Sequence, residues 1–235
     1  MRSVTYTDFI AAFGVGGAHP GGLTLTKKIL DGLEITEETN ILDVGCGTGQ
    51  TVDYIAEKYN CNVIGLDNNE TMLTKMRNRL KENDFDAKAV HGNVESLPFN
   101  DQSFDYVISE SVTSFTNILV ALKQYARVLK PQGTLIMIEM TKNVDLSQWE
   151  MDETKDFYGV TDVLSEREWG HYISLAGFER INTGNVNPLN YNTDVELDYS
   201  SDIDAQLVEM MGQHQMMLEK YGSKLGTRIY YCYLS

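Results

Sequence analysis

The chain has 235 residues, of which 42% are hydrophobic and 23% charged, a composition typical of globular proteins. Its 34 acidic side chains outnumber the 19 basic ones and give a formal net charge of −15. Since binding to a phosphate backbone needs a basic surface, we expect neither nucleic acid nor an anionic membrane as a partner. No apolar run has the length of a transmembrane helix or of a signal-peptide core, and the three cysteines are scattered, so a cytoplasmic protein is expected.

Short apolar runs alternate with amphipathic helical stretches through the first two thirds of the chain. The expected strands are Ile41–Val44, Cys61–Asp67, Ala87–His91, Phe104–Ser109 and Thr134–Glu139. The expected helices are Gln50–Tyr59, Thr71–Lys81 and Thr116–Lys130, the last ended by Pro131 and Gly133. This alternation is typical of βαβ units, so it predicts a parallel α/β sheet with helices on both faces and ligands at the carboxyl ends of the strands.

The alternation of strands and helices is less regular in the segments before and after this core. A glycine-rich stretch, GVGGAHPGG, precedes a helix expected around Leu25–Leu33. After the core, we expect helices over Asp145–Tyr158, Ser165–Ala176 and Ile203–Tyr221, and strands over Phe178–Gly184 and Arg228–Leu234. Because no linker divides the chain, we predict a single domain over 1–235, with a lid in 1–40, a cofactor-binding core in 41–140 and substrate-side elements in 141–235.

The sequence DVGCGTG at 43–49 lies directly between the first core strand and its helix. Glycines allow a tight turn there and let a ligand approach the backbone closely. Asp67 ends the next strand, where an acidic side chain can bind both hydroxyls of a ribose. The glycines alone are equally consistent with an ordinary tight turn, but the acid at Asp67 favours a nucleoside site.

The sequence of this glycine-rich loop indicates which nucleoside binds there. Dinucleotide folds use G-x-G-x-x-G and place a pyrophosphate at the helix N-terminus, whereas this loop reads G-x-G-x-G and follows the acidic Asp43. A carboxylate repels a pyrophosphate but suits a cation. S-adenosylmethionine has no phosphate and carries an ammonium and a sulfonium, so the loop favours it over NAD.

The sequence resembles the class I S-adenosylmethionine-dependent methyltransferases that act on small molecules. Segments similar to that family's motifs occur in order through residues 40–140: ILDVGCGTG, GLDN, HGNVESLPF, FDYVIS and LKPQGTL. The resemblance implies a Rossmann-like, seven-stranded, mostly parallel sheet of order 3-2-1-4-5-7-6, with Arg228–Leu234 as its antiparallel last strand and a small helical cap or lid.

The resemblance also implies roles for individual residues. The loop with Gly45, Cys46, Gly47 and Gly49 would hold the methionine part, with Asp43 near its ammonium. Asp67 would bind the ribose. The remaining positions implied are Asn68 and Met72 beside adenine, Asn93 and Val94 facing its edge, and Ser109 and Glu110 flanking the methyl group. Asn93 departs from the family pattern, which has Asp there, and Met72 fits core packing equally well.

Methyl transfer needs alignment more than acid–base chemistry, because a base is required only when the acceptor loses a proton. His19 is the first candidate base, with Glu110 beside the methyl position; a solvated turn at His19-Pro20-Gly21 is the alternative. Glu139 is a further candidate. Packing or exposure is the expectation for His171 and His214.

The predicted function is therefore metal-independent methyl transfer from S-adenosylmethionine to the O, N, S or C atom of a small molecule, giving S-adenosylhomocysteine, by a monomer or homodimer. The acceptor pocket is expected from Tyr6–Phe13, Trp149–Tyr158 and Asn187–Met217, which fit the core of a helical cap equally well. Three alternatives remain open: a non-catalytic S-adenosylmethionine-binding regulatory protein, a peptide methyltransferase and an NAD-dependent oxidoreductase.

Overall fold

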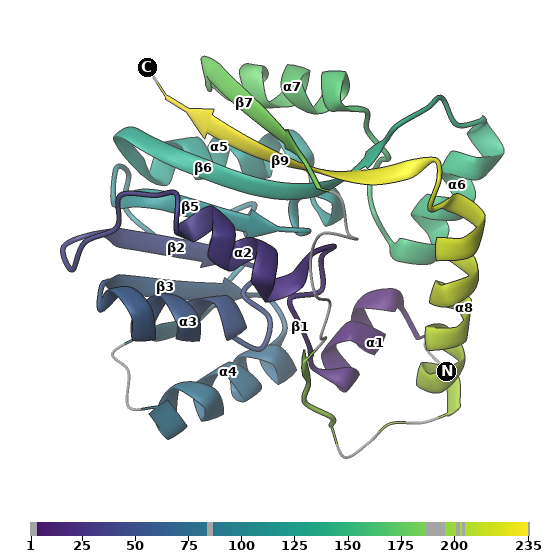
Figure 1. Ribbon diagram of the computed structural model, residues 1–235, viewed down its shortest axis with the longest axis horizontal. Helices are drawn as coiled ribbons and strands as arrows, with labels where there is room; N and C mark the ends of the chain where they lie inside the picture. Colours follow the sequence, from purple (N-terminus) through teal and green to yellow (C-terminus); the bar gives the residue numbers. More distant parts are fainter. Residues whose placement is uncertain (1–3, 84–86, 187–195, 201–202, 204, 235) are drawn as a thin grey trace.

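The computed structural model describes residues 4–83, 87–186, 196–200, 203 and 205–234. Its centre is a seven-stranded sheet of spatial order β4-β3-β2-β5-β6-β9-β7 (Figure 1). In chain order these strands are β2 (Asn40–Val44), β3 (Asn62–Asp67), β4 (Lys88–His91), β5 (Phe104–Glu110), β6 (Leu129–Lys142), β7 (Arg180–Asn185) and β9 (Leu225–Tyr233). β9 runs antiparallel to β6 and to β7, and the remaining neighbours pair in parallel. The predicted strand order and the antiparallel last strand are confirmed.

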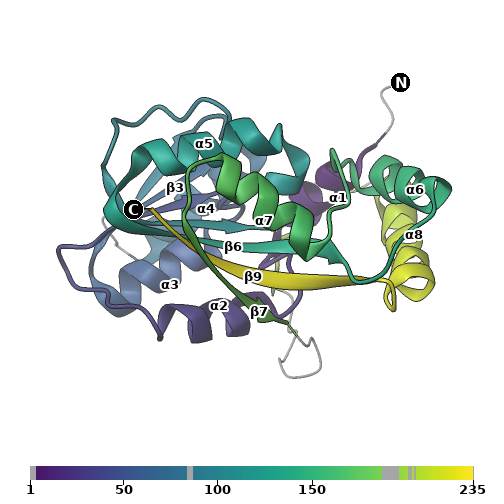
Figure 2. The ribbon, with the colours of Figure 1, turned by 90° about the horizontal axis from the view of Figure 1, so that it is seen from above.

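Helices cover both faces of this sheet (Figure 2). The helices α2 (Gly22–Leu30), α3 (Gln50–Tyr59) and α4 (Glu70–Asn83) bury apolar side chains in one layer, and α5 (Ile118–Val128) and α7 (Glu166–Leu175) bury theirs in the other. Along β2, Ile41 enters the first layer while Leu42 and Val44 enter the second. Since both faces of the strand are buried, Ile41 and Leu42 are apolar at consecutive positions, which explains why this strand was predictable.

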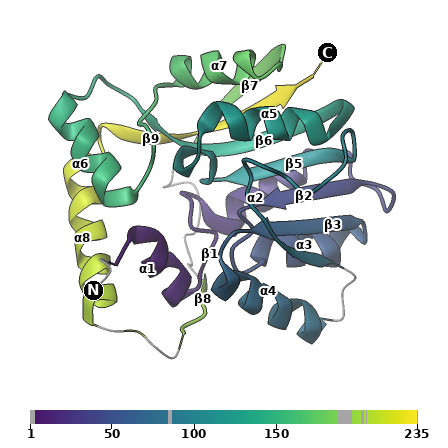
Figure 3. The ribbon, with the colours of Figure 1, turned by 180° about the vertical axis from the view of Figure 1, so that it is seen from behind.

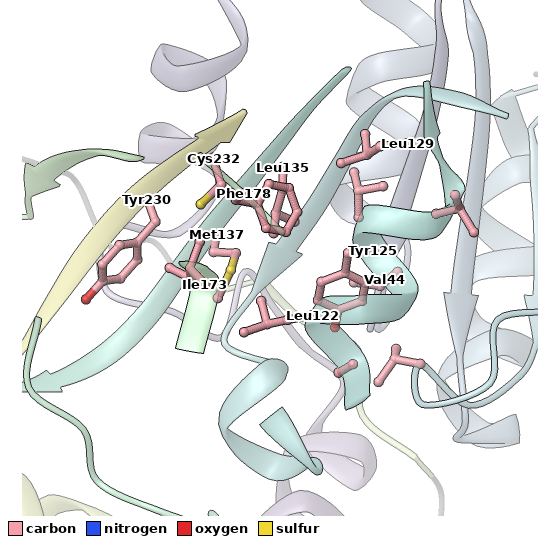
Figure 4. Close-up of a cluster of buried hydrophobic side chains, with 14 of the residues drawn as sticks. Val44, Leu122, Tyr125, Leu129, Leu135, Met137, Ile173, Phe178, Tyr230 and Cys232 are labelled. Carbon is pink, nitrogen blue, oxygen red and sulfur yellow. The ribbon is translucent and has the colours of Figure 1, made fainter. Parts of the chain in front are cut away.

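The layer under α5 and α7 holds several of the largest buried side chains (Figure 4). Tyr125, Phe178, Tyr230 and Cys232 are each at most 1% exposed. Burial in this apolar environment raises the pKa of the Cys232 thiol, so this cysteine serves packing and not chemistry.

The boundary between α5 and β6 was predicted wrongly. The helix expected to reach Lys130 ends at Val128, and β6 begins at the next residue. Phe104 of β5 pairs with Leu129, whereas Tyr106 pairs with Thr134, so extra residues bulge out of β6 between these two pairs. Gln132 takes a positive φ of 66° within the bulge. Pro131 and Gly133 therefore mark an irregular strand start and not the end of the helix.

Three helices form a cap beyond the carboxyl ends of the core strands: α1 (Tyr6–Phe13), α6 (Gln148–Tyr158) and α8 (Ala205–Tyr221) (Figures 1 and 3). The first was expected only as a pocket segment, although Thr5 and Asp8 form a complete capping box at its start. Nearby, β1 (Val15–Gly16) pairs with β8 (Glu196–Leu197) in a small antiparallel sheet. Residues 187–195, 201–202 and 204 of the predicted pocket segment Asn187–Met217 lie outside the described residues.

Candidate active site

A cleft of about 1650 Å³ lies between the carboxyl ends of the core strands and the cap. All predicted site residues except Gly49 and Ser109 line it. They are His19, Asp43, Gly45, Cys46, Gly47, Asp67, Asn68, Met72, Asn93, Val94 and Glu110. The chain thus brings together residues from the lid region, from the ends of β2, β3 and β5, and from the turn after β4.

The glycine loop after β2 is shaped by two glycines with different tasks. Gly47 has a φ of 52°, and a Cβ built there meets only Cε of Met72, at 4.0 Å, so this part of the backbone is open to the cleft. Gly49 has a φ of 79°, but a Cβ there would lie 2.4 Å from Cγ of Met76 on α4. Gly49 does not line the cleft, and its lack of a side chain allows α3 and α4 to pack closely.

Asp67 fixes the loop from the end of β3. Its Oδ2 accepts a hydrogen bond from the backbone N–H of Gly47 at 3.0 Å, and its Oδ1 accepts one from the N–H of Asn69 at 2.8 Å. Burial raises the pKa of this carboxyl group, and the N–H donors oppose that shift. Asp67 therefore couples the glycine loop to the end of the neighbouring strand.

Asp43 is the most unusual side chain of the cleft. It is 2% exposed, and among the described residues its carboxylate has neither a hydrogen-bond donor nor a cation as partner. Burial, together with the negative charges of Glu110 and Asp67, raises its pKa well above the ordinary value. A buried carboxylate without a partner is costly in the free protein, so this position favours a cationic ligand.

Residues that the sequence assigns to the adenine also line the cleft. Met72 is 6% exposed and Val94 is 7% exposed, and both face the cleft. The Oδ1 atom of Asn93 accepts a hydrogen bond from the backbone N–H of Glu95 at 2.9 Å. The amide side chain therefore holds its own turn while lining the cleft.

His19 and Glu110 both line the cleft and contact each other. The Nε2 atom of His19 lies 3.4 Å from Oε1 of Glu110, and only 2% of the histidine side chain is exposed. The alternative of a solvated turn at His19 is therefore wrong. Two threonines complete the cluster: the Thr26 hydroxyl donates to Oε1 of Glu110 at 2.6 Å, and the Thr51 hydroxyl donates to Oε2 at 3.0 Å.

These two threonines were missed in the sequence. Thr26 lies on α2 and Thr51 on α3, and both helices pack against the face of the sheet that carries Glu110. Strand alternation offered a signal, because it places Asp43 and Glu110 on one face. The hydroxyls themselves sit among apolar helix positions and have no distinctive spacing.

Ser109 does not flank the cleft as predicted. It lies within β5 and not beyond its end, is fully buried, and its Oγ is 2.9 Å from Oγ1 of Thr113. Alternation along the strand turns Ser109 towards the layer under α5, whereas Glu110 turns towards α2 and α3.

The other candidate bases have different surroundings in the structure. Glu139 is fully buried and lines the cleft, but its oxygens accept hydrogen bonds from the N–H of Val112 and Thr113 and from the Ser114 hydroxyl. It thus anchors the turn after β5, and burial raises its pKa. His171 is exposed on α7 and does not line the cleft, whereas His214 does, from the cap.

Among the residues that the structure describes, none of the helices is long and apolar enough to cross a membrane. No group of three or more His, Cys, Asp or Glu residues within the same part of the chain is arranged to hold a metal ion.

Comparison with known proteins agrees with this site. The family model described as "Methyltransferase domain" matches residues 41–133. The chain is 34% identical over 231 residues to the uncharacterized methyltransferase YodH of Bacillus subtilis, covering 97% of this chain and 98% of that one. It is 36% identical over 128 residues to a demethylmenaquinone methyltransferase of Listeria welshimeri, covering 53% and 54% of the two chains.

Among solved structures, phosphoethanolamine N-methyltransferase 2 of Haemonchus contortus in complex with S-adenosylmethionine superposes with a TM-score of 0.77 at 19% identity, covering 97% of this chain and 57% of that one. This likeness concerns the fold. Together with the full-length similarity to YodH, it places the chain in a family: it belongs to the class I S-adenosylmethionine-dependent methyltransferases.

Proposed function

We propose that this protein binds S-adenosylmethionine in the cleft and transfers its methyl group to a small-molecule acceptor. The observation that carries the proposal is Asp43, a carboxylate that is 2% exposed, lines the cleft and has no partner among the described residues. A cationic ligand would supply the missing counter-charge. NAD, with its pyrophosphate, would bring more negative charge to the same position.

The rest of the cleft fits the same cofactor. The open backbone at Gly47 would hold the methionine part, with the ammonium group near Asp43. Asp67 would bind the ribose hydroxyls, and Met72, Asn68, Asn93 and Val94 would surround the adenine. Cys46 belongs to the same loop, but its thiol does not act as a nucleophile, because burial and the nearby Asp43 and Asp67 raise its pKa.

The bound cofactor supplies a methyl group on a positively charged sulfur, which is already activated for displacement. The protein therefore has to align the acceptor, exclude water and, where the acceptor is a hydroxyl or a protonated amine, remove a proton. The cap made by α1, α6 and α8 covers the cleft and serves the first two tasks. We propose that His19, positioned by Glu110, receives the proton.

The net charge of −15 favours a small molecule over RNA as the acceptor. A non-catalytic S-adenosylmethionine-binding regulatory protein would have the same cofactor site, so only a measurement of turnover distinguishes it from an enzyme. No observation favours it over catalysis.

Calorimetric titration with S-adenosylmethionine, S-adenosylhomocysteine and NAD tests the cofactor assignment. We expect micromolar binding of both adenosyl compounds, no measurable heat with NAD, and a large loss of affinity in Asp43→Asn. Preference for NAD, or unchanged affinity in the variant, would contradict the proposal. Formation of S-adenosylhomocysteine in a screen of small-molecule acceptors then tests for turnover.

A further inference from the structure

The cleft extends from the glycine loop into the cap, where aromatic and methionine side chains line it. This end of the cleft, which we name the acceptor chamber, is lined by Tyr6 and Phe9 of α1, Phe157 and Tyr158 of α6, and Met210, His214 and Met217 of α8. The chamber and the glycine loop line the same cleft.

Four rings of the chamber contact one another. The centroid of Tyr6 lies 5.9 Å from that of Phe157, 5.0 Å from that of Tyr158 and 5.3 Å from that of His214. The planes of Phe157 and His214 are within 4° of parallel, with centroids 6.5 Å apart. Such a wall presents ring faces and edges, which attract another aromatic ring more than a saturated one.

The charges of the cleft exclude an anionic acceptor. Among the described residues that line it, Arg228 is the one lysine or arginine, and its guanidinium already donates to Glu166 and to the side chain of Asn143, both at 3.0 Å. The carboxylates that line the cleft are Asp43, Asp67, Glu95, Glu110, Glu139 and Asp156. A phosphorylated acceptor would lose its hydration without gaining an unpaired cation.

His214 supplies the polar group of the chamber. Its Nδ1 lies 3.3 Å from the hydroxyl of Tyr158, and its Nε2 has no hydrogen-bond partner among the described residues. Burial lowers the pKa of this ring, so it is neutral near pH 7. A neutral ring can exchange one hydrogen bond with a hydroxyl or carbonyl of a ligand without adding charge to the chamber.

We propose that the acceptor chamber binds an uncharged aromatic molecule whose polar substituent is hydrogen-bonded by Nε2 of His214. This inference rests on the proposed function, because it assigns the substrate class of the same cleft. His214 is thereby a specificity-determining residue, and the methyl acceptor is selected by ring contacts and by the exclusion of negative charge.

Three probes of similar size test the class, each titrated into protein saturated with S-adenosylhomocysteine: 2-naphthol, decahydro-2-naphthol and 2-naphthyl phosphate. We expect 2-naphthol to bind about tenfold more tightly than the saturated alcohol, and the phosphate to bind more weakly still. Equal or tighter binding of the phosphate would overturn the proposal, as would equal binding of the two alcohols.

A pair of methionines on α8 tests the role of charge. Met211 and Met216 are 50% and 60% exposed, but only Met211 lines the cleft. Met211→Arg should therefore improve binding of 2-naphthyl phosphate severalfold, whereas Met216→Arg should leave it unchanged. The same gain in both variants would indicate a general effect of surface charge and contradict the chamber's role.

The role of His214 is tested by His214→Phe, which keeps a ring but removes Nε2. We expect about a fivefold loss of affinity for 2-naphthol, the equivalent of one neutral hydrogen bond, and no loss for naphthalene. His171→Phe, an exposed site on α7, is the matched control. An equal loss for both ligands would show a purely structural role.

Failure of this inference is distinguishable from failure of the proposed function. If S-adenosylhomocysteine binds and none of the three probes does, the acceptor class is wrong while the cofactor site stands. If S-adenosylhomocysteine itself does not bind, the proposed function fails and the acceptor class fails with it.

Discussion

The imidazole of His19 faces the carboxylate of Glu110, with Nε2 and Oε1 3.4 Å apart, although one residue precedes the main sheet and the other ends β5. The pair is held by the hydroxyls of Thr26 and Thr51, which both donate to the carboxylate. A histidine fixed in this way keeps one orientation towards the cleft. Such a fixed orientation is what a group that receives a proton during the reaction requires.

If His19 receives the acceptor's proton, its loss should affect turnover and not cofactor binding. We expect His19→Ala to slow formation of S-adenosylhomocysteine about 100-fold with an acceptor that must lose a proton. Affinity for S-adenosylmethionine, measured by calorimetry, should stay within about threefold, because the proposal assigns His19 to the acceptor's proton and not to cofactor binding.

His171→Ala, which alters an exposed histidine outside the cleft, is the control for that experiment. Unchanged turnover in His19→Ala would leave the residue with a structural role only. The pH profile of kcat provides a second readout, since removal of a base should abolish the limb on which activity rises with pH.

The buried carboxyl group of Asp43 should make the stability of the ligand-free protein depend on pH. Its pKa in the folded state is raised above the ordinary 3.8, chiefly by burial and then by Glu110 and Asp67. The folded protein thus keeps a proton that the unfolded chain has already lost. The free energy of unfolding is therefore expected to fall as the pH rises through the raised pKa.

Asp43→Asn removes the charge but keeps the shape. Unfolding in urea at pH 8 should show the variant to be more stable by about 1–3 kcal/mol without ligand, and a weaker pH dependence should remain because the pKa of Asp67 is raised as well. The same variant should bind S-adenosylmethionine about 10- to 100-fold more weakly. A variant less stable than the parent at pH 8 would show that the carboxylate is satisfied in the free protein.

The central strands of the sheet were predictable because they are buried on both faces. Strands such as β2 and β5 contain consecutive apolar residues, and together with the amphipathic helices between them they indicate a parallel α/β sheet, whereas the strand order followed from the resemblance to the methyltransferase family. The bulge at Leu129 was not predictable in the same way. The proline and glycine there break a helix and start an irregular strand equally well, and only pairing with β5 decides between the two.

The candidate site was partly predictable for a different reason. Gly47 and Asp67 lie at sequence positions fixed by the strands that precede them, so motif spacing located them. Thr26 and Thr51 were missed because their role depends on how α2 and α3 pack over Glu110, a tertiary relationship that single-sequence spacing does not contain. The cap was missed in part because α1 is short and packs on sequence-distant α6 and α8.

Asp67 should be the side chain whose loss most weakens cofactor binding, because it orders the glycine loop and is the residue that we propose binds the ribose. Asp67→Ala removes the acceptor for the N–H of Gly47 and should weaken binding of S-adenosylmethionine at least about 30-fold. Calorimetry provides the measurement. Asp101→Ala, which removes a carboxylate paired with Arg127 outside the cleft, should leave affinity unchanged.

The two tryptophans differ in burial, so their replacement should change the free energy of unfolding by different amounts. Trp169 is fully buried under the sheet, and its Nε1 donates to the carbonyl oxygen of Met140 at 3.0 Å, whereas Trp149 is 63% exposed on α6. Trp169→Ala should lower the free energy of unfolding by about 3–5 kcal/mol, since it creates a cavity and leaves the half-buried carbonyl of Met140 without this donor. Trp149→Ala should change it by less than about 1 kcal/mol, the loss being mainly its contact with Lys220. Urea unfolding followed by circular dichroism measures both, and equal losses would mean that Trp149 is covered in solution.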